Sequence, residues 1–111
     1  MGGSPGYGER MIVAVVNFDL PAPLTTDEAR AMFEASAPSY QTVDGLLRKH
    51  YLLAEDGRSA GGVYLWESRD KADALYDQDW RDRVAARYGS PPKVSYFDSQ
   101  VTVDPSSIIV G

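Results

Sequence analysis

The sequence predicts an α+β fold of the ferredoxin-like type, with a four-stranded antiparallel sheet and two helices on one of its faces. Two observations carry this prediction. Two amphipathic helical segments each begin at a capping residue, and an Asp-Gly dipeptide joins two strand-like runs near the middle of the chain. The order is therefore strand, helix, strand, strand, helix, strand, which right-handed crossovers turn into a split βαβ sheet, βαββαβ.

The first strand and the first helix are both indicated by local pattern. Met11–Asp19 is rich in β-branched residues and apolar on both faces until Asn17 interrupts it, which is typical of a strand buried on both sides. Thr25 and Glu28 then form a capping box at the start of an amphipathic helix. We expect this helix to end just before Pro38, because proline removes a helical hydrogen bond.

The second half of the chain supplies the remaining elements. Two strands, residues 46–54 and 62–67, flank the Asp56-Gly57 dipeptide, which is a strong hairpin signal. Residues 69–88 show an apolar stripe at helical spacing and predict one continuous second helix. Residues 94–103 read as the last strand.

Length and composition predict one folded domain. The chain has 111 residues, of which 43% are hydrophobic, enough for one small core. Residues 1–10 are rich in glycine, and we expect a disordered tail that is either native or an expression remnant. The folded domain is expected to span residues 11–104, followed by a C-terminal tail at 105–111. No long apolar run or signal-type segment is visible, so a cytoplasmic protein is expected.

Charge and residue types exclude several classes of function. The net charge is −5 with scattered basic residues, so neither nucleic acid nor an anionic membrane is expected as a partner. With no cysteine and one histidine, His50, the chain cannot build a thiolate or polyhistidine metal site within one subunit. It also has no glycine-rich nucleotide motif, so we expect neither a metal nor a bound cofactor.

Helices on one face leave the other face of the predicted sheet bare. We expect the aliphatic pair Val63 and Leu65 to meet the helices and the aromatic side chains to lie on the bare face. That bare face would be more apolar than a monomer usually exposes, so a homodimer that packs two such faces into an α+β barrel around a small ligand is expected. The side chains expected there are Met11, Val13, Val15, Asn17, Tyr64 and Trp66.

The hairpin register decides which side chains stand beside the aromatic pair. A two-residue loop at Asp56-Gly57 pairs Lys49 with Tyr64, so that Lys49, Tyr51, Tyr64 and Trp66 share one face. We favour this register because Asp-Gly is the preferred dipeptide for it.

A three-residue loop at 57–59 is the alternative. It would place His50 opposite Trp66 and make His50, not Lys49, the neighbour of the aromatic face. In the favoured register His50 is expected to face the helices.

Four groups of residues carry a family resemblance. Gly45-Leu46, Lys49, the segment GGVYLWE at 61–67 and Phe97-Asp98 together resemble the YdhR-like monooxygenase family, over roughly residues 11–104. That family belongs to the dimeric α+β barrel superfamily, with antibiotic-biosynthesis monooxygenases, haem-degrading monooxygenases and some polyketide cyclases. The resemblance implies a homodimer that holds a small-molecule ligand.

The resemblance also implies roles for two residues. In the haem degraders, an asparagine near the end of the first strand and a tryptophan near the end of the third face the ligand, and Asn17 and Trp66 lie at similar positions. The haem-ligating histidine of the second helix has no counterpart here, because no histidine lies between Ser68 and Gly89. Haem degradation is therefore not expected.

Three polar residues are candidate catalytic groups. Asn17 would hydrogen-bond a bound carbonyl or an oxygenated intermediate, or else find a partner across the dimer or on the backbone. Lys49 would stabilise a phenolate or enolate, although a lysine on an edge strand also protects against aggregation. His50 is the side chain with an ordinary pKa near neutrality and is a candidate base.

Three aromatic residues are candidates for substrate binding. Tyr64 and Trp66 offer flat walls for a planar aromatic ligand, or would equally fill a dimer interface. Tyr51 would assist Lys49 in binding a phenolate.

The expected function is a cofactor-independent monooxygenase acting on a small aromatic or quinol-like substrate. Such a substrate would itself pass an electron to oxygen once deprotonated. Two alternatives stay open at this point. One is a polyketide-type cyclase or isomerase, in which Lys49, Tyr51 or His50 would do acid–base work without oxygen, and the other is a non-catalytic ligand-binding dimer.

Overall fold

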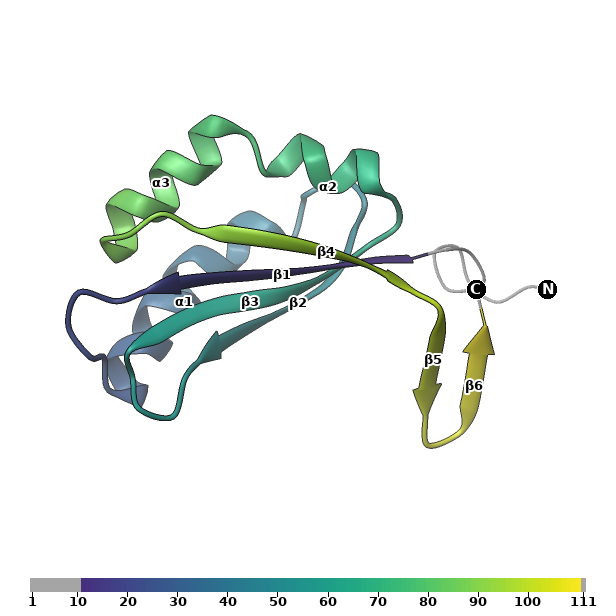
Figure 1. Cartoon of the computed structure of the whole chain (residues 1–111), viewed down its shortest axis with the longest axis horizontal. Coiled ribbons are helices and arrows are strands. Elements are labelled where there is room, and N and C mark those ends of the chain that lie inside the picture. Colours follow the sequence, from purple (N-terminus) through teal and green to yellow (C-terminus); the bar gives the residue numbers. More distant parts are fainter. Residues whose placement is uncertain (1–10, 111) are drawn as a thin grey trace.

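The computed structural model describes residues 11–110 (Figure 1). The predicted tail at residues 1–10 lies outside this range. The elements in chain order are β1 (Met11–Asp19), α1 (Thr26–Tyr40), β2 (Leu46–Leu53), β3 (Ser59–Trp66), α2 (Arg69–Leu75), α3 (Gln78–Tyr88), β4 (Lys93–Ser99), β5 (Val101–Asp104) and β6 (Ser107–Val110).

The predicted ferredoxin-like architecture is confirmed. The four-stranded sheet has the order β2-β3-β1-β4, and its neighbouring strands are antiparallel. The three helices lie on one face of this sheet (Figure 1). The core fills the space between the sheet and the helices. The opposite face of the sheet carries no helix and is called the open face below.

Helix α1 begins as predicted and ends later than predicted. The Thr25 hydroxyl accepts from the Glu28 amide, and the Glu28 carboxylate accepts from the Thr25 amide, which completes the capping box. The expected end before Pro38 is wrong, because Pro38 lies inside the last turn and the helix continues to Tyr40. Pro38 has no N–H group to donate to the backbone carbonyl of Glu34. Glu34 is exposed, so a water molecule can donate to this carbonyl instead. Tyr40 is thereby held on the helix.

The predicted second helix is divided into two, α2 and α3. Tyr76 leaves the helical conformation, with φ −82° and ψ 44°, and its side chain is buried. Asp77 then caps a new helix by accepting from the Trp80 amide. Gly89 ends α3 at φ 91°, in the left-handed region that favours glycine. The break lets both Tyr76 and Trp80 reach the core.

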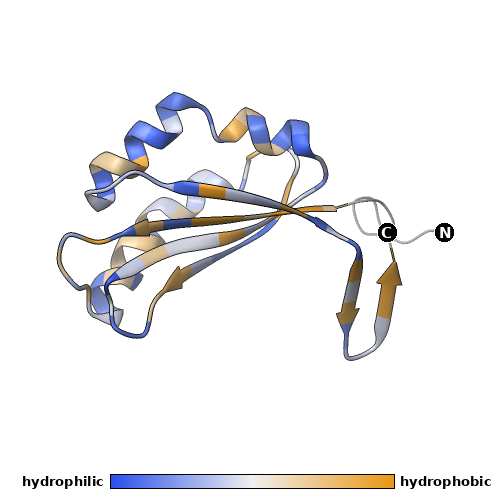
Figure 2. Cartoon of the chain, in the orientation of Figure 1, coloured by the Kyte–Doolittle hydropathy of each residue, from blue (hydrophilic) through white to orange (hydrophobic). Residues whose placement is uncertain are grey.

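The predicted last strand is likewise divided. β4 ends at Ser99, which pairs with Met11, so within the described chain β1 offers no further partner beyond that point. β5 pairs instead with β6, and the Asp104 carboxylate accepts from Ser106 and Ser107 in the turn between them. This hairpin projects from the sheet, and its two strands are mostly hydrophobic (Figures 1 and 2). The sequence pattern did not predict a strand at 107–110.

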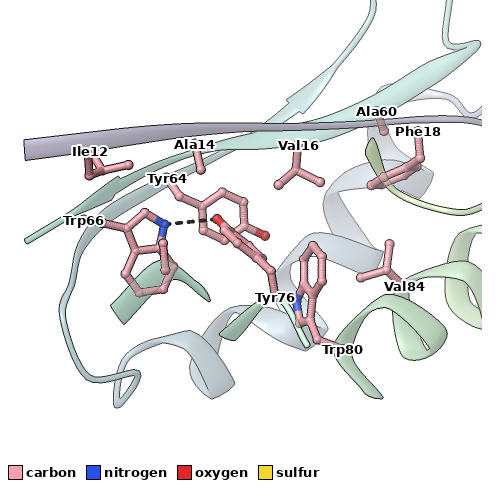
Figure 3. Close-up of a cluster of buried hydrophobic side chains, with 11 residues drawn as sticks. Ile12, Ala14, Val16, Phe18, Ala60, Tyr64, Trp66, Tyr76, Trp80 and Val84 are labelled. Carbon is pink, nitrogen blue, oxygen red and sulfur yellow. Dashed lines mark hydrogen bonds between the residues drawn. The ribbon is translucent and has the colours of Figure 1, made fainter. Parts of the chain in front are cut away.

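The expected assignment of the sheet faces is wrong. Trp66 is completely buried and Tyr64 is 3% exposed, and both lie beneath the helices (Figure 3). The indole Nε1 of Trp66 donates to the Tyr76 hydroxyl at 3.1 Å. Val63 and Leu65, expected to meet the helices, lie on the open face. The helix-facing side chains of β1 are Ile12, Ala14, Val16 and Phe18.

The hairpin register, by contrast, is the favoured one. Lys49 pairs with Tyr64 and Tyr51 with Gly62. A β-bulge between Leu46 and Arg48 then shifts the register before Trp66. The register is the predicted one, but the helices cover the opposite face of the sheet from the one expected. His50 therefore lies exposed on the open face, and the expectation that it faces the helices is wrong.

Candidate functional site

A cavity of about 450 Å³ lies between the sheet and the helices. Its walls come from β1, β2 and β3 on one side and from all three helices on the other. Most of the lining is apolar or aromatic, as in ordinary small-molecule sites. Six aromatic side chains line it: Phe18, Tyr40, Tyr51, Tyr64, Trp80 and Tyr88.

The ammonium group of Lys49 lies in a cage of tyrosine rings at this cavity. Its Nζ is 3.4 Å from the ring centroid of Tyr40, 3.7 Å from that of Tyr51 and 4.7 Å from that of Tyr64. Strand β2 supplies Lys49 and Tyr51, β3 supplies Tyr64, and the last turn of α1 supplies Tyr40. The cage therefore depends on the helix continuing past Pro38.

Gly62 has no side chain, and this leaves room for the cage. A Cβ atom at Gly62 would lie 3.1 Å from Cε1 of Tyr64 and 3.4 Å from Cε of Lys49, so any side chain there would press on both. The neighbouring Gly61 permits close approach of β3 to β1, because a Cβ there would lie 1.8 Å from the carbonyl oxygen of Val16. The glycine pair of the GGVYLWE segment thus shapes the floor of the cavity.

Hydrogen bonds and ring contacts fix the cage tyrosines in place. The Tyr51 hydroxyl and the Ser36 hydroxyl are 2.6 Å apart, and the Tyr51 ring stacks on Phe33 with centroids 4.8 Å apart. The Tyr40 hydroxyl accepts from Nε1 of Trp80 at 3.0 Å. Rings held from behind in this way present a preformed surface to a ligand.

Burial lowers the pKa of Lys49 to about 7. Within residues 11–110, no carboxylate lies within ion-pair distance of its ammonium group to counter this effect. The tyrosine rings attract the protonated form through their quadrupoles and act in the opposite direction from burial. Lys49 therefore changes its charge near neutral pH, and its neutral amine is available as a base.

The tyrosines around it do not compete for this role. Burial raises the pKa of Tyr64, and the nearby Tyr40 hydroxyl adds to the effect. Burial also raises the pKa of Tyr51, partly offset by its hydrogen bond with Ser36. Both phenols therefore remain protonated at neutral pH and can act only as hydrogen-bond donors or as walls.

The structure brings together only some of the candidates predicted from sequence. Lys49, Tyr51 and Tyr64 line the cavity as a group. Trp66 lies behind Tyr64, with parallel rings and centroids 6.3 Å apart, and is a buried support and not a lining residue. Asn17 and His50 are exposed on the open face of the sheet, so the expected grouping of Asn17 with Trp66 is wrong.

The cavity lining that sequence reasoning did not assign to a site includes Tyr40, Trp80, Arg83 and Arg87. The helical pattern indicates only core positions for Tyr40 and Trp80, and it does not single out Arg83 and Arg87. The two arginines are four residues apart on α3, and Arg83 directly precedes the buried Val84. This spacing beside an apolar stripe was a signal that could have placed them at the edge of the core.

Two kinds of feature are absent from the described part of the chain. Between residues 11 and 110, no three histidine, aspartate or glutamate side chains are grouped so that they could hold a metal ion. No helix in that range is long and apolar enough to cross a membrane.

A family model described as "Putative mono-oxygenase ydhR" matches residues 13–99, from the third residue of β1 to the end of β4. The chain belongs to this family. The match covers the sheet apart from the first two residues of β1, all three helices and every residue that lines the cavity, and it leaves the β5–β6 hairpin outside. The resemblance seen in the GGVYLWE segment of this ydhR-family chain is therefore confirmed.

Two solved structures show the same fold. A monooxygenase from the gene ActVA-Orf6 of Streptomyces coelicolor, in complex with nanaomycin D, is 22% identical, with 92% of this chain and 96% of that chain covered and a TM-score of 0.65. SnoaB, a cofactor-independent oxygenase from Streptomyces nogalater, is 18% identical, with 86% and 98% covered and a TM-score of 0.63. A search among curated proteins finds no significant match to the ydhR-family chain.

Proposed function

We propose that this ydhR-family protein is a cofactor-independent monooxygenase that acts on a small aromatic or quinol-like substrate in the cavity between sheet and helices. The observation that carries the proposal is Lys49, a partly buried amine with a pKa of about 7 in an aromatic cage at the cavity. The description of SnoaB as a cofactor-independent oxygenase and the nanaomycin D bound by the Streptomyces coelicolor protein support the same class of chemistry.

The proposed reaction begins with a proton transfer to the neutral amine of Lys49. The substrate is an anthrone or a dihydroxyarene, whose acidic C–H or O–H group lies against the cage. Proton transfer produces an electron-rich carbanion or phenolate, and the new ammonium ion stays beside the developing negative charge. Placing base and substrate together in a largely apolar site is expected to supply much of the rate enhancement.

Oxygen then reacts with the anion. One electron passes from the anion to O₂, and the resulting radical pair combines to form a C–O bond and a hydroperoxide. The ammonium of Lys49 returns its proton, and loss of water leaves a carbonyl group. For an anthrone, the CH₂ group becomes C=O and O₂ supplies the carbonyl oxygen and one water, so that atoms and electrons balance.

Oxygen uptake and its pH dependence test this proposal. With anthrone or 1,4-dihydroxynaphthalene, we expect one O₂ consumed per product formed and a kcat/KM that rises with pH and levels off above about 7. The rise follows because only the neutral amine accepts a proton. Spontaneous oxidation is subtracted with a heat-denatured sample. Product formation that continues unchanged under argon would contradict the proposal.

A cyclase or isomerase is the second candidate, and the same lysine supports it. A neutral amine beside an apolar cavity can remove a proton next to a carbonyl group, and its ammonium can then return the proton elsewhere on the enolate without oxygen. Turnover of a polyketide-like ketone under argon, lost when Lys49 is replaced, would favour this candidate.

We further propose that two chains associate through the open face of the sheet. Val13, Val15, Val63 and Leu65 form a half-buried aliphatic patch there, and Leu52 at the edge strand is 42% exposed. Such a patch is usually covered in solution. Asn17, on the same face, would then find its hydrogen-bond partner across the interface.

Light scattering after size exclusion tests the dimer. We expect the protein to elute with twice the chain mass of 12.2 kDa, and Val15→Lys to elute as a monomer, because a lysine in an apolar interface loses its hydration. Glu34→Lys, on the exposed side of α1, is the matched charge control and should remain dimeric. A wild-type protein of single-chain mass at micromolar concentration would contradict the proposal.

A further inference from the structure

The charged side chains that line the cavity are all basic. They are Lys49, Arg83 and Arg87, and the lining includes no aspartate or glutamate from the described residues. This is unexpected for a chain with 16 acidic and 11 basic residues and a net charge of −5. Two guanidinium groups, and a lysine amine that is protonated below about pH 7, produce a local positive potential that attracts anions.

The two arginines lie on the exposed side of the cavity, whereas Lys49 is half-buried. Arg83 and Arg87 are one turn apart on α3, and both are exposed although they line the cavity. Arg87 donates to the backbone carbonyl of Met32 at 2.8 Å, which joins α3 to α1. A ligand that extends from Lys49 to the exposed arginine side of the cavity would have one end beside the guanidinium groups.

The two arginines differ in how much of their hydrogen-bonding capacity is already used. Arg87 is committed in part to Met32. Within the described residues, Arg83 has no ion pair and no hydrogen-bonded acceptor for its guanidinium group. A planar guanidinium with free N–H groups matches the two oxygens of a carboxylate. Arg83 is thus the residue that is free to bind an incoming acid.

We propose that the cavity selects aromatic substrates that carry a carboxylate, which Arg83 binds at the exposed side of the cavity while the ring lies against the tyrosine cage of Lys49. This inference rests on the proposed function, because it assigns a substrate class to the same site. Arg87, fixed across the two helices, adds positive charge beside the bound carboxylate. The apolar walls bind the ring, so the arginines provide selectivity between acids and their neutral analogues.

A pair of ligands that differ only in charge tests the inference. The probes are 1-hydroxy-2-naphthoate and the neutral 1-hydroxy-2-naphthamide, titrated into the full-length protein by calorimetry under argon, so that no turnover is needed. We expect the acid to bind about tenfold more tightly than the amide, as a charge-assisted hydrogen bond at a partly exposed site would give. Raising the salt concentration from about 50 to about 500 mM should reduce this preference.

Variants show whether Arg83 is responsible. Arg83→Gln should weaken binding of the acid about tenfold and leave binding of the amide unchanged. Arg30→Gln, an exposed arginine on α1 that does not line the cavity, is the matched control and should alter neither affinity. Equal affinities of the wild type for acid and amide, no binding of either, or an equal loss of both in Arg83→Gln would overturn the inference.

The result is separable from the oxygenase proposal. A tenfold preference for the acid without oxygen uptake on any substrate would support the inference and contradict the monooxygenase. Oxygen-dependent turnover with no preference for acids in binding or in KM would support the monooxygenase and contradict the inference.

Discussion

Lys49→Met is expected to lower kcat/KM for oxygen-dependent turnover by at least about 100-fold, because a positioned general base contributes roughly 10²–10⁴-fold to a reaction. Methionine nearly matches the length of lysine and can fill the space between Tyr40, Tyr51 and Tyr64, so the cavity should keep its shape. Initial rates of oxygen uptake, measured between about pH 6 and 9, give the comparison. The variant should also lose the rise of kcat/KM through pH 7.

The same variant should be more stable than the wild type. Lys49 has a pKa of about 7 in the folded protein against 10.5 for an ordinary lysine, so between these values the unfolded chain binds a proton that the folded chain does not. Stability therefore rises with pH from about 7 to 10.5, and the full cost of burying the amine is present below pH 7. That cost is at most roughly 5 kcal/mol. Because the variant also gives up the attraction between the ammonium and the tyrosine rings, the expected gain is about 2–4 kcal/mol at pH 6.

Two further variants separate a base from a simple positive charge. Lys49→Arg keeps a cation in the cage but cannot be deprotonated, so it should lose turnover to the same extent as Lys49→Met. Lys93→Met, at an exposed position, should show no gain in stability that depends on pH between about 7 and 10. Wild-type turnover in Lys49→Arg would show that charge alone is needed, and an unchanged stability of Lys49→Met at pH 6 would show that the amine carries no burial cost.

Trp66→Ala is expected to reduce the free energy of unfolding by about 3–5 kcal/mol, the usual cost of truncating a large aromatic side chain in a core. Trp66 is completely buried, donates to the Tyr76 hydroxyl and lies parallel to Tyr64. Its removal would leave a cavity beneath α2 and an unpaired hydroxyl. Urea denaturation followed by circular dichroism gives the comparison.

Milder variants keep this prediction testable if Trp66→Ala does not fold. Trp66→Phe keeps an aromatic ring but loses the indole N–H, and Tyr76→Phe keeps the ring but removes the acceptor. Each should cost about 1–3 kcal/mol, because each leaves a buried polar group without its partner. A loss below about 0.5 kcal/mol in both would mean that the hydrogen bond between Trp66 and Tyr76 contributes little to the fold.

Features that depend on neighbouring residues could be predicted from the sequence. The bounds of β1, the capping box at Thr25 and Glu28, and the pairing of Lys49 with Tyr64 all agree with the structure. Each depends on a local signal: apolar runs, a side chain that caps the adjacent backbone, or a turn dipeptide that sets the register. The ferredoxin-like order of elements follows from these signals together.

The face of the sheet that the helices cover could not be predicted in this way. Alternation along a strand shows which side chains share a face, but it does not show which of the two faces the helices cover. The same pattern therefore allows Trp66 to be buried under helices or in a dimer. The break at Tyr76 supports the burial of Trp66 under the helices, because it places a tyrosine hydroxyl where the Trp66 indole can donate to it. The Lys49 cage is built from residues of α1, β2 and β3. No local sequence pattern indicates that these elements, distant in the chain, come into contact.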